Sequence, residues 1–204
     1  MPEGTSPKTV SGIAFGVYEY SERYLIRKWL PHDVNVVELG GSIGIVSREI
    51  LRCIKPERSL IVVEAIPKLA ELVKKNVGSL YPITRWKLVQ AAIAYGCDDV
   101  PFVAGSEHIA GRIGRDGKGM RLRATTLSSI LQDTQLTDFS LVMDIEGAEH
   151  EVVRHDISAL ARCQCVIAEL HGEQTDKDAF CRKLQEIGLT LVERKHSVVA
   201  FLRK

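Results

Sequence analysis

The chain has 204 residues, 45% of them hydrophobic and 26% charged, a composition typical of one globular domain with a substantial core. The formal net charge of +1 gives no general reason to expect binding to nucleic acid or to an acidic membrane. No apolar run approaches the roughly 18 residues of a membrane span, and the polar start of the chain does not have the pattern of a signal peptide. Five cysteines without a C-x-x-C pair favour buried thiols in a reducing compartment, so we expect a cytoplasmic location.

Segments with the pattern of strands alternate with segments of helical periodicity along most of the chain. The strands are expected at 34–39, 60–63, 86–93, 139–143, 165–170, 189–193 and 198–202. Helices are expected to begin at Ile45, Pro67, about Leu127, about Gly147 and behind a capping box formed by Thr175 and Asp178.

This alternation, with nearly continuous apolar strands, predicts an α/β fold in three layers. We expect one domain over residues 1–204, with a mostly parallel sheet of seven strands, helices on both faces and an antiparallel pair of strands at the C-terminal end. Within it we separate an N-terminal segment (1–33), a cofactor-binding half (34–95), an inserted region of short strands and a basic loop (98–126), and an acceptor-side half (127–204).

A glycine-rich turn follows the first expected strand, and an acid, Glu64, ends the second. In open α/β sheets, ligands bind beyond the carboxyl ends of the strands, where glycine lets the backbone turn sharply or approach a ligand. A carboxylate at the position of Glu64 can accept hydrogen bonds from the ribose of a nucleoside. The turn, helix, strand and acid together favour a nucleoside site over a simple turn. The candidate cofactor-binding residues are Glu38, Gly40, Gly41, Ser42, Gly44, Glu64, Ala65 and Ala91.

The spacing of the glycines favours one nucleoside over another. A dinucleotide fingerprint, G-x-G-x-x-G, would need glycines where Ser42 and Ile45 stand, and the glycine-lysine pair of a phosphate-binding loop is also absent. S-adenosylmethionine has no phosphate and carries an ammonium group, which Glu38 is placed to bind directly or through water. The acid-x-G-x-x-x-G turn therefore suits S-adenosylmethionine better than NAD.

A second group of acids, Asp144, Glu146 and Glu149, follows the strand expected to lie beside the first. Acids at this strand end can attract the sulfonium side of the cofactor, orient an acceptor hydroxyl or take its proton. Glu146 and Glu149 could instead be first-turn residues that favour the helix dipole. We assign Asp144 and Glu146 to catalysis and leave both readings open for Glu149.

The chain resembles the FkbM-type methyltransferases in five segments that occur in the same order and spacing. These are VVELGGSIG, IVVEAIP, TTLSSIL, VMDIEGAEHEVV and VIAELH, of which the D-x-E-G-x-E run at 144–149 is the most distinctive. The resemblance implies a Rossmann-like class I methyltransferase fold and methylation of oxygen, commonly a hydroxyl of a sugar, glycolipid or polyketide-like product. It also implies that Gly40 and Gly44 shape the cofactor loop, that Glu64 holds the ribose and that Asp144 and Glu146 face the reaction centre. Glu38 and Gly40-Gly41-Ser42 depart from the frequent Asp and Gly-Ala-Asn, but they keep the charge or the small size.

Two residues near the end of the fifth expected strand complete the candidate site. His171 could take a hydroxyl proton at neutral pH if its pKa lies near the ordinary value of about 6.5. A lone histidine in a loop could equally be only hydrogen-bonded. Glu169 is assigned to acceptor binding. Asp144, Glu146, Glu169 and His171 would suit a hard ion such as Mg²⁺ if they converged, but we do not favour a metal.

A glycine-rich basic loop is expected at residues 105–119, and its run of cations continues to Arg123. It is either a solvated loop or a lid over the acceptor, and Arg112 and Arg115 are the candidates for reaching an anionic group. Nucleic acid is not favoured as a partner because no aromatic residues interleave with these cations.

The sequence therefore predicts an S-adenosylmethionine-dependent O-methyltransferase that acts on a small-molecule or glycan acceptor. Two alternatives remain open: an N-methyltransferase for protein or nucleic acid, and a non-catalytic scaffold that binds the cofactor. The missing N-P-P-Y-type tetrapeptide after the fourth strand counts against the first, and the acids at 144 and 146 count against the second.

Overall fold

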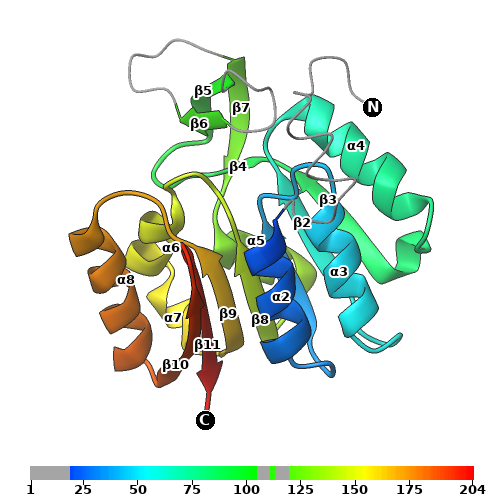
Figure 1. Cartoon of the computed structure of the whole chain (residues 1–204). Coiled ribbons are helices and arrows are strands. Elements are labelled where there is room, and N and C mark those ends of the chain that lie inside the picture. The colour runs from blue at the N-terminus through cyan, green and yellow to red at the C-terminus, as the bar shows by residue number, and fades with distance from the viewer. Residues whose placement is uncertain (1–18, 105–110, 114–119) are drawn as a thin grey trace.

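A computed structural model describes residues 19–104, 111–113 and 120–204 of the chain. A central sheet lies between two groups of helices, and a smaller sheet rises above its upper edge (Figure 1). The strands of the central sheet are β1 (Asn35–Leu39), β2 (Leu60–Glu64), β3 (Trp86–Gln90), β8 (Phe139–Met143), β9 (Cys163–Glu169), β10 (Leu189–Lys195) and β11 (Val198–Arg203). The helices are α2 (Tyr20–Trp29), α3 (Ile45–Cys53), α4 (Pro67–Gly78), α5 (Leu127–Thr134), α6 (Glu149–His155), α7 (Ile157–Leu160) and α8 (Gln174–Glu186).

The central sheet has seven strands in the order β10-β11-β9-β8-β1-β2-β3. The pairs β8–β9, β8–β1, β1–β2 and β2–β3 are parallel, whereas β11 runs antiparallel to both of its neighbours. The predicted α/β class, the mostly parallel seven-stranded sheet and the antiparallel C-terminal pair are therefore confirmed. Because β1 lies beside β8, the two predicted groups of site residues lie at the same edge of the sheet.

Each face of the sheet is covered by its own set of helices. On one face, α2, α3 and α4 pack their apolar residues against the side chains of Val36, Val62 and Val142. On the other face, α5 to α8 pack against Val37 and Leu141, among other residues. Strand residues alternate between the two faces, so both sides of β1 and β8 are buried, as expected for a parallel sheet in a three-layer domain.

The structure differs from the sequence-based prediction at three places. The expected third strand, 86–93, breaks at Ala91, and its end becomes β4 (Ala92–Ile93) of the smaller sheet. That sheet has the order β4-β7-β5-β6 and also contains β5 (Asp99–Ala104), β6 (Gly111–Ile113) and β7 (Met120–Thr125). Helix α2 was not predicted. The predicted capping box is wrong because α8 begins at Gln174, which places Thr175 inside the helix.

Two further findings concern the chain as a whole. Among the described residues, no helix is both long enough and apolar enough to span a membrane. All five cysteines are free thiols, and Cys163, Cys165 and Cys181 are buried as expected, while Cys97 is exposed.

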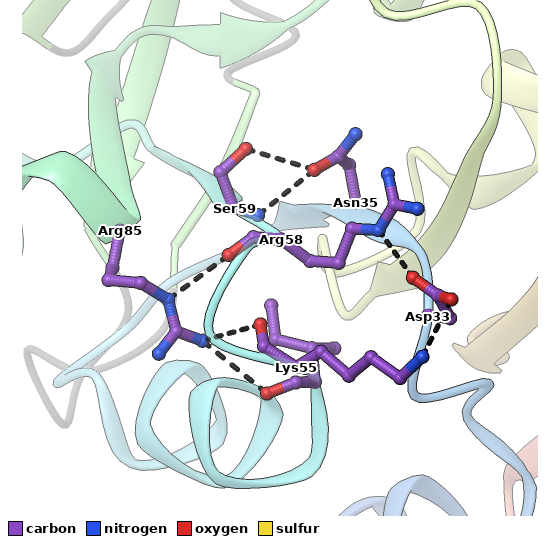
Figure 2. Close-up of polar contacts among 7 residues, drawn as sticks. Asp33, Asn35, Lys55, Arg58, Ser59 and Arg85 are labelled. Atoms are coloured by element: carbon purple, nitrogen blue, oxygen red, sulfur yellow. Dashed lines mark hydrogen bonds and ion pairs between the residues drawn. The ribbon is translucent and has the colours of Figure 1, made fainter.

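A cluster of polar contacts fastens the amino ends of the first three strands, away from the predicted site (Figure 2). The guanidinium of Arg85, at the end of the 3₁₀ turn Ile83–Arg85, donates hydrogen bonds to the backbone oxygens of Arg58 and Lys55, each at 3.1 Å, and to two carbonyls of the α3 C-terminus. Helix ends leave carbonyls without partners, and a cation there also interacts favourably with the helix dipole. Arg85 therefore fixes the end of α3 against the start of β3.

Replacing Arg85 with alanine is expected to lower the free energy of unfolding by about 2–3 kcal/mol, because several carbonyls lose a charged donor. Lys55→Ala is the matched control from the same cluster. The ion pair of Lys55 with Asp33 is exposed to solvent, so we expect a clearly smaller loss than for Arg85→Ala. Denaturant unfolding of both variants measures the difference, and equal losses would contradict this role of Arg85.

Candidate functional site

The register of the strands places several acids in one layer at the carboxyl edge of the sheet. Val62, Val142 and Ile167 belong to the core that contacts α2 and α3. Side chains alternate along a strand, so the residues two positions further on, Glu64, Asp144 and Glu169, start from the same face. Glu38 of β1 lies one step below them, in register with Val142.

The glycine turn after β1 and the acids after β8 meet through their backbones. The Asp144 amide donates to the Leu39 oxygen at 3.0 Å. Gly40 has a φ of +92°, and a Cβ on this residue would lie 1.9 Å from the Asp144 carbonyl oxygen. Glycine is thus required here by both its conformation and the close approach. The two groups of residues that the sequence singled out form one site.

The glycine turn is held in place by Glu64. The Glu64 carboxylate accepts hydrogen bonds from the amides of Ser42 and Ile66, both at 2.7 Å. Burial raises the pKa of Glu64 to about 7, although these amide contacts oppose the rise. Each carboxylate oxygen can accept more than one hydrogen bond, so these contacts leave acceptor capacity for a ribose. The role of Glu64 in holding the ribose stays a prediction.

Glu38 fits a site for a positively charged group. Its carboxylate is 1% exposed, and Ser47 of α3 donates to Oε2 at 2.5 Å. Its other oxygen, Oε1, has no hydrogen-bond partner among the described residues. Burial raises its pKa well above the usual value. A buried carboxylate oxygen without a donor is costly, and the ammonium group of S-adenosylmethionine would supply one. The residues present therefore fit the expected cofactor.

The turn after β8 is organised by Glu149. Its side chain is completely buried, and its carboxylate accepts from the amides of Ile145 at 2.9 Å and Gly147 at 3.0 Å. Within this turn, Glu146 has a φ of 54°, which is uncommon for a residue with a side chain. Glu149 is thus the internal support of the turn that presents Asp144 and Glu146. Glu149 is also the first residue of α6, so the first-turn interpretation is confirmed, with the carboxylate buried in the turn.

His171 lies in the middle of the acids. Its Nδ1 is 3.2 Å from Glu149 Oε1, and its Nε2 is 3.8 Å from Asp144 Oδ1 and 3.6 Å from Glu146 Oε2. The hydrogen bond with Glu149 raises the pKa of His171 to about 9, with further contributions from the charges of Glu149, Asp144 and Glu146. The expected pKa of about 6.5 is therefore wrong, because an imidazole among three carboxylates keeps its proton at neutral pH.

Asp144 has the properties of a group that exchanges a proton near neutral pH. Burial raises its pKa to about 7, the charge of Glu169 adds to the rise, and the charge of His171 opposes it. Its Oδ1 has no hydrogen-bond partner among the described residues. A carboxyl group with a perturbed pKa at a strand end is a candidate general base.

The residues that could hold a metal ion differ from the set expected from the sequence. Asp144, Glu149 and His171 each offer a ligand atom within 4.8 Å of the others, whereas Glu146 and Glu169 are not part of this group. Glu149 already accepts backbone hydrogen bonds on both oxygens, and a metal ion would compete with them. The ion pair with His171 accounts for the cluster without a metal.

The remaining candidates lie in different surroundings. Ala91 is buried, and its amide donates to the backbone carbonyl oxygen of Glu64 at 3.2 Å. Ala91 therefore lies beside the proposed ribose site, as does the half-buried Ala65. Glu169 accepts from Ser197 at 2.7 Å. Arg112 belongs to β6, and its side chain is not described, while Arg115 lies outside the described residues, as does the rest of the basic loop except 111–113.

One acid at this edge was not predicted from the sequence: Glu22 of α2, which is 4% exposed. A helix-period reading of residues 20–29 would have found it, because Glu22 shares the buried face with Leu25 and Ile26.

Comparison with known proteins gives a family and a set of similar folds. A family model described as the methyltransferase FkbM domain matches residues 54–201. A search of curated proteins found no match.

Three solved structures illustrate the shared fold. A precorrin-6y C5,15-methyltransferase from Geobacter metallireducens is 14% identical, with a TM-score of 0.57 over 98% of this chain and 93% of that one. A proposed tRNA (m1A22) methyltransferase of Streptococcus pneumoniae in complex with S-adenosyl-L-methionine is 11% identical, with a TM-score of 0.57 over 89% and 71%. Aeropyrum pernix fibrillarin with bound S-adenosyl-L-methionine is 10% identical, with a TM-score of 0.53 over 88% and 73%.

Replacing Glu149 with glutamine is expected to lower the pKa of His171 from about 9, because the charge and the hydrogen bond that raise it are lost. The amide keeps an acceptor oxygen for the turn. Titration of the His171 ring by NMR measures the shift. Glu146→Gln is the matched control and should lower the pKa less, because Glu146 is half-exposed and makes the weaker contact. A pKa still near 9 in Glu149→Gln would contradict the assignment.

Proposed function

The chain belongs to the FkbM methyltransferase family and depends on S-adenosyl-L-methionine, and we propose that it transfers the methyl group to a hydroxyl oxygen. The proposed acceptor is a sugar, a glycoconjugate or a glycosylated or polyketide-like small molecule. The observation that carries the proposal is the position of Asp144. Its carboxyl group has a pKa of about 7 and an oxygen without a hydrogen-bond donor, and it adjoins the glycine turn that the cofactor needs.

The cofactor-binding part of the proposal uses the residues around β1 and β2. We assign the glycine turn and Glu38 to the amino-acid end of the cofactor, and Glu64, Ala65 and Ala91 to the ribose and the base. When bound, S-adenosyl-L-methionine supplies a methyl group on a positively charged sulfur. Gly40 lets the turn approach Asp144, so the residues that would hold the methyl donor adjoin the proposed base.

The proton of the acceptor is assigned to Asp144. A hydroxyl group is a weak nucleophile at neutral pH, so its proton must leave as the new O–C bond forms and the S–C bond breaks. In this proposal Asp144 Oδ1 takes that proton. Protonated His171, fixed by Glu149 at 3.2 Å, keeps the Asp144 carboxyl oriented and partly ionised. Glu146 lies on the open side and accepts a hydrogen bond from the acceptor.

The choice of oxygen over nitrogen as the acceptor atom rests on this transfer of a proton to Asp144. An uncharged aromatic or amide-type nitrogen acceptor calls for different positioning groups, whereas a hydroxyl needs a base whose pKa is near the working pH. At the carboxyl edge of the sheet, Asp144, Glu146 and Glu169 also offer several carboxylate oxygens, which suit an acceptor rich in hydroxyl donors. The Streptococcus pneumoniae neighbour, named as a tRNA methyltransferase, keeps an RNA acceptor as the second candidate.

The acceptor class is tested by supplying methyl-labelled S-adenosyl-L-methionine with separate glycan, glycoside, RNA and protein fractions. We expect label in the glycoside or glycan fraction, and mass spectrometry with fragmentation to place it on an oxygen. Label on an RNA or protein nitrogen would replace the proposal with the second candidate. The Asp144→Asn variant is the control, and it should bind the cofactor but lose turnover by about 10²-fold or more.

The pH dependence follows from the two shifted groups. Asp144 acts as a base only when ionised, so kcat/KM should fall as the pH drops below about 7. His171 acts in its protonated form, so kcat/KM should fall again as the pH rises above about 9. His171→Gln should remove the alkaline limb and keep the acidic one. A profile of His171→Gln that retains the alkaline limb would contradict the role of the imidazolium.

A further inference from the structure

Helix α2 carries a buried acid on a face that is otherwise apolar. Leu25 and Ile26 of this face are completely buried in the core that α2 shares with the sheet, and Glu22, one turn earlier, is 4% exposed. Helix α2 packs against α3, β9 and β11, so its first turn lies over the carboxyl edge of the sheet. Carboxylates are rarely buried to this degree without a partner.

The charges around Glu22 are negative. Its pKa is raised well above the usual value, first by burial and then by the charges of Asp144, Glu19, Glu38 and Glu169. Among the described residues, one cationic side chain, His171, forms an ion pair with any of Glu22, Glu38, Asp144 and Glu169. Of these four acids, His171 contacts only Asp144. Glu22 itself is in no described ion pair.

A second buried glutamate on the same helix interface shows what a structural acid looks like in this protein. Glu49 of α3 is 5% exposed, but Arg27 donates to both of its oxygens, at 2.9 and 2.6 Å, and Arg23 donates at 3.2 Å. These contacts lower the pKa of Glu49. Two buried acids of one interface thus have opposite surroundings, and within the described part of the chain only Glu49 has its charge balanced by cationic side chains.

The missing balance around Glu22 fits a cation that comes from outside the chain. Glu38, which adds to the charge at Glu22, has a buried oxygen without a donor among the described residues. A primary ammonium group has three donors and a full positive charge, and it can satisfy two or three carboxylates at once. A sulfonium has no N–H or O–H donor and would leave the Glu38 oxygen without one.

We propose that Glu22 of α2 binds the ammonium group of S-adenosyl-L-methionine together with Glu38, so that α2 is part of the cofactor site. This inference rests on the cofactor of the proposed function and not on its acceptor. It assigns a binding role to an element outside the glycine turn and outside the residues matched by the family model.

The test is calorimetric binding of three ligands to the wild type and to Glu22→Gln. S-adenosylmethionine has both the ammonium and the sulfonium, S-adenosylhomocysteine has only the ammonium, and methylthioadenosine has neither. Glu22→Gln should weaken the first two by the same factor, about tenfold or more, because each loses a charge-assisted hydrogen bond. Binding of methylthioadenosine should change less than about twofold, since its contacts do not involve the ammonium site.

Thermal unfolding without ligand separates this role from a structural one. Glu22→Gln replaces a buried carboxyl group with an amide of the same shape, so the variant should unfold at the same or a higher temperature than the wild type. Glu49→Gln is the matched control. It should unfold at a lower temperature, because two arginines lose their partner, and it should weaken all three ligands equally or not at all.

Each other outcome overturns the proposal. Equal weakening of all three ligands by Glu22→Gln would mean that Glu22 acts through the fold. Weakening of S-adenosylmethionine alone would place Glu22 at the sulfonium, and no weakening would remove it from the site. These measurements need no acceptor, so they are independent of whether oxygen is methylated. A wild type that binds none of the three ligands would overturn the cofactor assignment and this inference together.

Discussion

The close contact between the backbone of Gly40 and that of Asp144 is the constraint on which the site depends. It joins the turn after β1 to the turn after β8, and it leaves no space for a side chain at position 40. Parallel pairing of β1 with β8 brings the two turns to the same edge, and the hydrogen bond from Asp144 to Leu39 fixes their relative height. The cofactor turn and the proposed base therefore cannot move independently. Preorganisation of this kind is how a fold contributes to a transfer reaction in which orientation dominates.

Charge balance explains why the acids at this edge have different properties. Glu149 accepts hydrogen bonds from backbone amides and contacts His171. Glu64 accepts hydrogen bonds from two amides, and Glu169 accepts one from Ser197. Glu22 and Glu38 have fewer partners, and burial raises the pKa of each well above its usual value. The fold thus accepts an electrostatic cost at the positions where a positively charged ligand would offset it, which is a common feature of functional sites.

The sequence predicted the sheet and most of its helices because their signals are local. The glycine turn, Pro67 at the start of α4 and the apolar strands each follow from neighbouring residues. The short strands of the inserted region were expected, but the break at Ala91 and the joining of these strands into a second sheet could not be predicted, because they depend on the pairing of β4 with β7, more than 30 residues away. Within the site, the structure brings together Asp144, Glu146 and His171, which the sequence predicted as one group, and their catalytic roles stay predictions. The pKa of His171 and the supporting position of Glu149 depend on distances across two turns, which spacing along the chain does not give.

The break at Ala91 has a consequence for how such a chain can diversify. At this residue the chain leaves the central sheet while its amide still contacts Glu64, and it returns to the helical layer through β7 and α5. The small sheet is therefore an excursion whose two ends are adjacent, since Ala92 pairs with Ala124. An excursion with adjacent ends can be lengthened, shortened or exchanged without changing the register of any central strand. A change in the length of the small sheet would therefore leave the contact between Gly40 and Asp144 in place.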